Sequence, residues 1–137
     1  VTASRVRPDV ALVLEGTTAN DMAGTPGHRL VTAVGGGAAI TFADGRTIVP
    51  ERMMVALREA AKREGIPFQM RRGTAGGTDA GMIHRSLAGV VCGGISVPCR
   101  YIHSPVSVAA ISDINAAYRL AHTFLDQKLF DEVLNHV

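Results

Sequence analysis

Three segments of this 137-residue sequence carry side chains that could do chemistry, and each follows an apolar run. The first of these runs, VALVLEG, ends with the carboxylate of Glu15 and a glycine. A carboxylate at the end of a buried strand is costly unless it binds a cation or a hydrogen-bond donor. Two interpretations of Glu15 therefore stay open: it is a metal ligand, or it accepts hydrogen bonds from nearby backbone amides.

The second segment is RYIHSP, residues 100–105, and its candidate is His103. A neutral imidazole can ligate zinc or a similar ion, although a lone loop histidine can also be simply solvated. The remaining histidines make no local metal motif. They are His28, His84, His122 and His136.

The third segment is a compact loop ahead of a predicted helix, made of Gly76, Gly77, Thr78 and Asp79. Glycines let a backbone approach a ligand closely, and amides at a helix start can hold a substrate carbonyl or carboxylate. The alternative is that Thr78 or Asp79 caps the helix while the glycines turn the chain.

Other familiar chemistries lack their motifs. Residues 35–37 are three glycines without the GK[ST] ending of a phosphate loop, so they predict a flexible lead-in to a strand rather than a nucleotide site. No GxSxG motif is present, and Cys92 lies within an apolar strand, where a raised pKa keeps a thiol inert. Cys92 and Cys99 form no CxxC pair, and we expect both to be reduced.

The elements that must position these segments follow from apolar periodicity. Strands are predicted at residues 10–16, 38–44, 66–71 and 90–98, the first of them buried on both faces, with a loop over 17–28. An amphipathic helix runs from Pro50 to Gly65, and a shorter one ends near Leu87. A last helix begins near Ser112 as N-cap, and its predicted buried face consists of Ile114, Ala117, Leu120, Ala121, Phe124 and Leu125.

This alternation of strands and helices predicts an α/β fold: a largely parallel sheet with helices on both faces. In such sheets a ligand crevice lies beyond the carboxyl ends of the strands. The three polar segments all follow strands, so we expect them to converge on one crevice.

Composition excludes several other classes of protein. The chain has 47% hydrophobic residues, enough for one core, and 14 Lys and Arg against 12 Asp and Glu, with no basic stripe for nucleic acid. No apolar stretch reaches the roughly 20 residues that span a bilayer, and the start VTASRVRPD lacks the long apolar segment of a signal peptide. We expect a cytoplasmic protein that binds neither nucleic acid nor membrane. The start at Val1, close to a strand, suggests a chain cut from something longer or a trimmed domain.

Taken together, LEGTTAND, GGTDAG and PCRYIHSP resemble the tetrahedral, TET-type family of metallo-aminopeptidases, which includes glutamyl and deblocking aminopeptidases. Some members carry the older name endoglucanase. The resemblance implies that residues 1–137 are the carboxyl-terminal part of a zinc-peptidase-like catalytic domain. It also implies peptide substrates, a pair of divalent ions (zinc or cobalt) that activate water, and a homo-oligomer, a dodecamer in the family.

Residue by residue, the resemblance makes Glu15 a carboxylate ligand of one metal and His103 the histidine ligand of the other. Many members have Asp at the Glu15 position. Gly76, Gly77, Thr78 and Asp79 would border the substrate pocket, with no definite role for Asp79. The family's other ligands and its general base lie upstream of the residues present, so these 137 residues are expected to be inactive alone.

Two other functions compete with that of an aminopeptidase. One is a non-catalytic α/β remnant or assembly module that binds no metal. The other is a glycosidase, which would want two carboxylates and aromatic rings for stacking on sugars. With no Trp and two Tyr, support for the glycosidase is thin.

Overall fold

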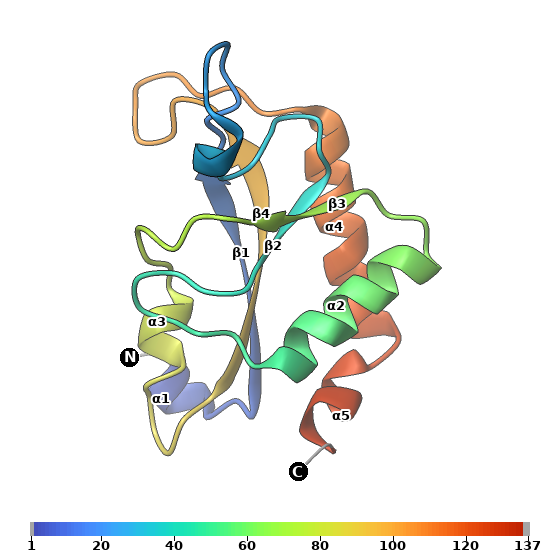
Figure 1. The fold of residues 1–137 in the computed structure, drawn as a ribbon. Helices are drawn as coiled ribbons and strands as arrows, with labels where there is room; N and C mark the ends of the chain where they lie inside the picture. The colour runs from blue at the N-terminus through green and yellow to red at the C-terminus, as the bar shows by residue number, and fades with distance from the viewer. Residues whose placement is uncertain (1, 136–137) are drawn as a thin grey trace.

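A computed structural model describes residues 2–135 of the chain, which form one mixed sheet flanked by helices (Figure 1). The expectation for His136 lies outside these residues. Within residues 2–135 there are four strands and five α-helices, with one short 3-10 turn at Gly27–Arg29. In order they are α1 (Thr2–Val6), β1 (Val10–Thr18), β2 (Ala38–Thr41), α2 (Glu51–Arg63), β3 (Phe68–Arg71), α3 (Ala80–Ile83), β4 (Val91–Cys99), α4 (Ile111–Asp126) and α5 (Leu129–Leu134).

The strands lie in the order β1-β4-β2-β3. β1 and β4 pair in parallel along nine residues, from Val10 opposite Val91 to Thr18 opposite Cys99, and β2 and β3 are also parallel. β4 and β2 run antiparallel. The largely parallel sheet is thus confirmed, with an antiparallel seam in its middle. Alternation of strands and helices along a sequence does not say which strands become neighbours, so the seam could not be predicted.

Helices cover both faces of the sheet, as predicted, but unequally (Figure 1). The large core joins α2, α4 and α5 to one face, and β1 contributes Val10 and Leu12 to it. The small core lies on the other face, where α3 packs on Ala11 and Val13. Because side chains alternate along a strand, Glu15 shares the α3 face with Ala11 and Val13.

The prediction that β1 is buried on both faces is wrong. β1 is an edge strand of the sheet formed by residues 2–135, and Leu14 is 58% exposed. A continuous apolar run is typical of a central strand, but nothing in these residues covers the end of this one.

The prediction for the last helix is wrong in its start and in part of its buried face. α4 begins at Ile111 after Ala110, Ser112 is exposed without capping, and Ile114 and Leu125 are exposed. The spacing of the apolar residues predicts the wrong rotation of α4 about its own axis, because the charged residue Asp113 faces the core and is 0% exposed. The residues that α4 buries are Asp113, Ala116, Ala117, Leu120, Ala121 and Phe124.

Asp113 also explains the three glycines, which are not a flexible lead-in. Its carboxylate accepts hydrogen bonds from the Gly35 amide at 2.7 Å and from the Gly37 amide at 2.9 Å. The turn before β2 is therefore fastened to the first turn of α4.

Three predicted elements are clearly shorter in the structure, one of which is β3, which begins at Phe68 rather than at residue 66. β2 stops at Thr41, because the chain turns back at Asp44, whose carboxylate accepts hydrogen bonds from the amides of Arg46 and Thr47. α3 stops at Ile83, ahead of a left-handed residue at Leu87. Across residues 2–135, no helix has the length and apolar character needed to cross a membrane.

Candidate functional site

A cleft of about 160 Å³ lies over the carboxyl-terminal half of β1, where the three polar segments meet. Its lining comes from the end of β1, the end of β3, the loop after β3 and the loop after β4. The lining residues are Glu15, Gly16, Thr17, Thr18, Arg71, Ala75, Gly76, Gly77, Thr78, Ile102 and His103.

Of the six site residues predicted from sequence, Asp79 alone is missing from the lining of this cleft. Asp79 lines a larger cavity of about 630 Å³ between α1 and α3, beside Met82 and Arg85. We take the smaller cleft as the site, because it holds both the Glu15 carboxylate and the His103 imidazole. Asp79 does not cap α3 with its side chain, whereas the Thr78 hydroxyl accepts a hydrogen bond from the Ala80 amide.

Glu15 is partly buried in a region of negative charge. Burial is the main cause that raises the pKa of its carboxyl above the usual value of 4.5. The nearby carboxylates of Asp44 and Asp79 raise this pKa further, while Arg71 lowers it. No backbone amide of residues 2–135 contributes a hydrogen bond to the shift, so the interpretation of Glu15 as an amide-bound carboxylate gains no support. A bound cation would relieve this repulsion.

Arg71 is a feature of the cleft that the sequence did not reveal. This side chain is 8% exposed, and its Nε donates to the Thr17 hydroxyl at 3.0 Å. Its Nη atoms donate to the carbonyl oxygens of Ala43, Gly73 and Ala75. Arg71 therefore ties the loop of residues 73–79, called the glycine-rich loop below, to the end of β1. Arg71 and Arg72 are adjacent in the sequence, and nothing local distinguishes the buried one.

The glycine-rich loop is also held from the side of β2. The Gly45 amide donates to the Gly76 carbonyl at 2.7 Å. Gly76 has a φ of +81°, a conformation that glycine adopts at no steric cost. The glycines of this loop thus allow a tight turn along the rim of the cleft.

His103 lies on a loop that closes on itself. Backbone hydrogen bonds between Arg100 and Val108, at 2.9 and 3.1 Å, join the two ends of the loop. Tyr101 and His103 both adopt the left-handed region, with φ of 60° and 65°. His103 is exposed at the mouth of the cleft.

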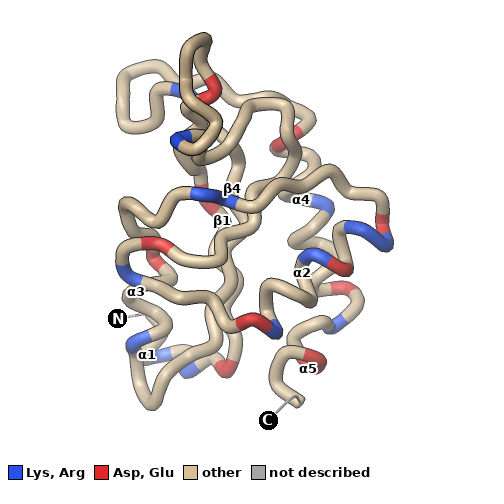
Figure 2. Tube along the Cα trace, in the orientation of Figure 1, with Lys and Arg blue, Asp and Glu red and all other residues tan. Residues whose placement is uncertain are grey.

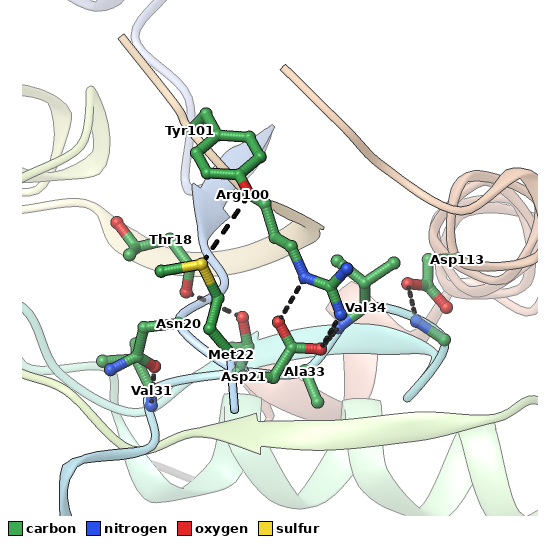
Figure 3. Close-up of polar contacts among 12 residues, drawn as sticks. Thr18, Asn20, Asp21, Met22, Val31, Ala33, Val34, Arg100, Tyr101 and Asp113 are labelled. Atoms are coloured by element: carbon green, nitrogen blue, oxygen red, sulfur yellow. Dashed lines mark hydrogen bonds and ion pairs between the residues drawn. The ribbon is translucent and has the colours of Figure 1, made fainter. Parts of the chain in front are cut away.

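The base of this loop is bound to Asp21, in the segment after β1 (Figure 3). Arg100 Nε donates to Asp21 Oδ1 at 2.7 Å, and Arg100 Nη2 donates to Asp21 Oδ2 at 2.8 Å. Asp21 Oδ2 also accepts a hydrogen bond from the Val34 amide at 3.0 Å. Sequence marked the TTAND segment as polar but could not pair its aspartate with an arginine 79 positions away.

The donor set fits a divalent metal in part. A carboxylate oxygen and an imidazole nitrogen, as in Glu15 and His103, are ligands that zinc and cobalt accept. Within residues 2–135, however, no group of three or more His, Cys, Asp or Glu side chains could hold a metal ion. These residues therefore offer two candidate ligands on one cleft, and a complete site needs more.

The cysteines take no part in this cleft. Both Cys92 and Cys99 are free thiols, as predicted. Burial raises the pKa of Cys92 to about 11, so its thiol stays protonated at neutral pH.

Comparison with known proteins places this geometry in context. A model of the M42 glutamyl aminopeptidase family matches residues 1–120. A protein of Acetivibrio thermocellus, provisionally named an aminopeptidase, is 41% identical over 116 residues, which are 84% of this chain and 34% of that protein.

Two solved structures share the fold closely. Aminopeptidase APDkam598 from the archaeon Desulfurococcus kamchatkensis superposes with a TM-score of 0.92 at 35% identity, over 97% of this chain and 38% of its own. A TET aminopeptidase from the marine sediment archaeon Thaumarchaeota archaeon SCGC AB-539-E09 superposes with a TM-score of 0.91 at 36% identity, over 96% and 37%. The chain thus spans about a third of the length of the curated relatives it matches.

Proposed function

The chain belongs to the M42 glutamyl aminopeptidase family, and from this premise we propose that it forms part of a metal-dependent aminopeptidase that removes amino-terminal residues from peptides. Residues 1–137 would be the carboxyl-terminal part of the catalytic domain. The observation that carries the proposal is the meeting of Glu15, the glycine-rich loop and His103 on one cleft.

In this proposal Glu15 and His103 each ligate one of two divalent ions, zinc or cobalt. Once bound, such ions supply Lewis acidity and lower the pKa of water. Ionised Glu15 contributes negative charge to a position that Asp44 and Asp79 already make negative, which favours a cation there. The other ligands and the general base are expected outside the described residues, since these contain no three-ligand group.

The glycine-rich loop is proposed to border the bound peptide. Gly76 and Gly77 line the cleft without side chains, so a substrate backbone can come close to the loop. Arg71 holds the loop from behind through the Gly73 and Ala75 carbonyls, which keeps its shape fixed when substrate binds.

Assembly and location belong to the same proposal. The similarity to a TET aminopeptidase supports a homo-oligomer, and a dodecamer is the specific form we propose. We also propose that the protein is cytoplasmic and binds neither nucleic acid nor membrane. Basic and acidic residues are interspersed along the trace, which is consistent with that (Figure 2).

A kinetic experiment on the full-length protein, including any sequence beyond these 137 residues, tests the proposal. Hydrolysis of aminoacyl p-nitroanilides is measured after chelation and after reloading with Zn²⁺ or Co²⁺. We expect chelation to abolish activity, and His103→Ala and Glu15→Gln each to lower kcat/KM about 100-fold or more. His122→Ala, an exposed histidine on α4 outside the cleft, is the matched control and should leave kcat/KM unchanged.

Each competing function predicts a different result. Activity that survives both chelation and His103→Ala would overturn the aminopeptidase assignment. Absence of any hydrolysis by the metal-loaded wild-type protein would favour the non-catalytic module. The glycosidase gains no support from the cleft, since its described lining residues include no Phe, Tyr or Trp for stacking on a sugar.

A further inference from the structure

We propose that the Asp21–Arg100 ion pair is a positioning device for His103, which fixes the loop that presents this imidazole to the cleft. The inference rests on the proposed function, because it takes His103 as a metal ligand. It assigns a task to two residues that touch neither the proposed metal nor the substrate.

The loop requires an external constraint. Tyr101 and His103 both adopt left-handed backbone conformations, which cost about 1 to 2 kcal/mol at a non-glycine residue. The described contacts inside the loop are few: the Arg100–Val108 backbone pair, the Ser104 amide bound to the Tyr101 carbonyl at 3.2 Å, and hydrogen bonds from the Ser104 hydroxyl to its own loop. Outside the loop, the exposed Tyr101 hydroxyl also contacts Met22 Sδ at 3.7 Å, which is a weak hydrogen bond. Such a strained conformation persists only where the surroundings hold it.

The Asp21–Arg100 pair supplies this constraint at the base of the loop. Its two N–H···O bonds, at 2.7 and 2.8 Å, form a fork that fixes both distance and orientation. The side chains are 34% exposed for Arg100 and 13% for Asp21, so the pair is partly shielded from water. Arg100 lies directly before Tyr101, and any displacement of the arginine backbone is passed to the turn that carries His103.

Asp21 itself is held in place from the other side (Figure 3). The Val34 amide donates to its carboxylate, and the neighbouring Asn20 side chain accepts a hydrogen bond from the Val31 amide at 2.7 Å. The Thr32 hydroxyl donates to the Thr18 carbonyl at 2.8 Å. The Asp21 carboxylate thus connects the loop of His103 to the segment that follows β1. Since β1 carries Glu15, the positions of the two proposed ligands are linked through this contact.

A double-mutant cycle on the full-length protein tests this role through Co²⁺ binding rather than activity. The quantity measured is the Co²⁺ affinity of the site that loses its ion in the His103→Ala variant. A fluorescent chelator that competes for Co²⁺ reports this affinity in a titration. The variants are Asp21→Asn, Arg100→Lys, His103→Ala and Asp21→Asn combined with His103→Ala. Glu59→Gln is the matched control, since it breaks an exposed ion pair of similar length, 2.8 Å to Lys62, on α2.

We expect Asp21→Asn and Arg100→Lys each to weaken this Co²⁺ affinity about tenfold. Asparagine has one acceptor oxygen in place of the two that Arg100 binds, and lysine cannot form both hydrogen bonds at once. In the His103→Ala background Asp21→Asn should cause no further loss of Co²⁺ affinity, since its effect acts through that imidazole. Glu59→Gln should leave the affinity unchanged. Circular dichroism identifies variants that do not fold, and Arg100→Lys provides the test if Asp21→Asn is one of them.

Failure of this inference differs from failure of the proposed function. If His103→Ala weakens Co²⁺ binding while both ion-pair variants leave it intact, the positioning role is wrong and the ligand assignment stands. An equal loss from Asp21→Asn in both backgrounds would make Asp21 a general support of the fold and would also overturn the role. If His103→Ala itself leaves Co²⁺ binding unchanged, the ligand assignment and the positioning role fall together.

Discussion

Two arginines lie beside the cleft, and they serve it in different ways. Arg100 is bound to a carboxylate, whereas Arg71 donates to a hydroxyl and to carbonyl oxygens and has no ion pair within residues 2–135. The charge of Arg71 is therefore free to act on Glu15, whose pKa it lowers against the effect of burial. A buried cation beside a carboxylate ligand can adjust the metal affinity of that carboxylate without itself contacting the metal.

The sequence could predict those site residues whose type and place along the chain by themselves suggest metal binding. Glu15 and His103 follow apolar strands, and a carboxylate or an imidazole in such a place suggests ligation. Arg71 and Asp21 were missed because their roles depend on partners 54 and 79 positions away. No local pattern encodes such pairs.

The ion pair at Asp21 predicts a specific pH dependence of stability. Hydrogen bonds from Arg100 are the main cause that lowers the pKa of Asp21 from 3.8 to about 2. Since the folded state binds this proton less tightly than the unfolded chain, the stabilisation is fully present above pH ~4 and is lost as the pH falls through about 2. Asp21→Asn should therefore lower the melting temperature at pH 7, and the difference from wild type should shrink between pH 4 and pH 2. A difference that stays constant over this range would contradict the prediction.

Among the elements, α4 contributes both to the large core and to the hold on the turn before β2. Its inward-facing Asp113 fastens the turn at residues 35–37, and its apolar residues fill the large core. The extent of α2 and the existence of α4 follow from apolar spacing, as predicted. The rotation of α4 does not, because an aspartate bound to two amides is stable in the interior while two apolar residues remain outside.

The turn before β2 provides a test of how closely it packs against the residues that precede β3. Gly35 and Gly37 have nearly the same positive φ, 86° and 85°, but a Cβ at Gly37 would overlap the Pro67 carbonyl, whereas a Cβ at Gly35 would meet nothing. Gly35→Ala should cost about 1 to 2 kcal/mol of unfolding free energy, the cost of an alanine in this conformation. Gly37→Ala should cost about 3 kcal/mol or more, because backbone must move as well. Urea unfolding measures both, and equal losses would show that the close approach to Pro67 is not limiting.

For the molecule as a whole, composition and alternation specify an α/β fold with helices on both faces. They do not specify that β1 lies at an edge beside β4, nor that the two faces differ so much in core size. The meeting of the segments after β1 and β4 could be anticipated, because these strands run in the same direction and their carboxyl ends lie at the same end of the sheet. The glycine-rich loop joins them although it follows β3, which runs in the opposite direction, and the prediction of a parallel sheet does not explain that.

The unequal cores predict an unequal response to cavities. Leu120 is 0% exposed in the large core, whereas Ile83 is partly exposed at the small one. Leu120→Ala should lower the unfolding free energy by about 3 to 4 kcal/mol and Ile83→Ala by about 1 to 2 kcal/mol. Denaturant titration of the two variants compares them directly. A greater loss from Ile83→Ala would mean that the α3 face, not the α4 face, dominates stability.

The pairing of β1 with β4 also sets the order in which the molecule can be built. During synthesis β1 emerges before β4, its strand partner within residues 2–135, which follows about 80 residues later, and such distant pairing is slow to form. Until then the apolar run of β1 lacks the partner that it has within residues 2–135, and apolar strands exposed in this way favour aggregation. β4 leads directly into the loop of His103. When β4 pairs with β1 and joins the sheet of residues 2–135, the same step therefore brings His103, the second proposed ligand, to the cleft of Glu15.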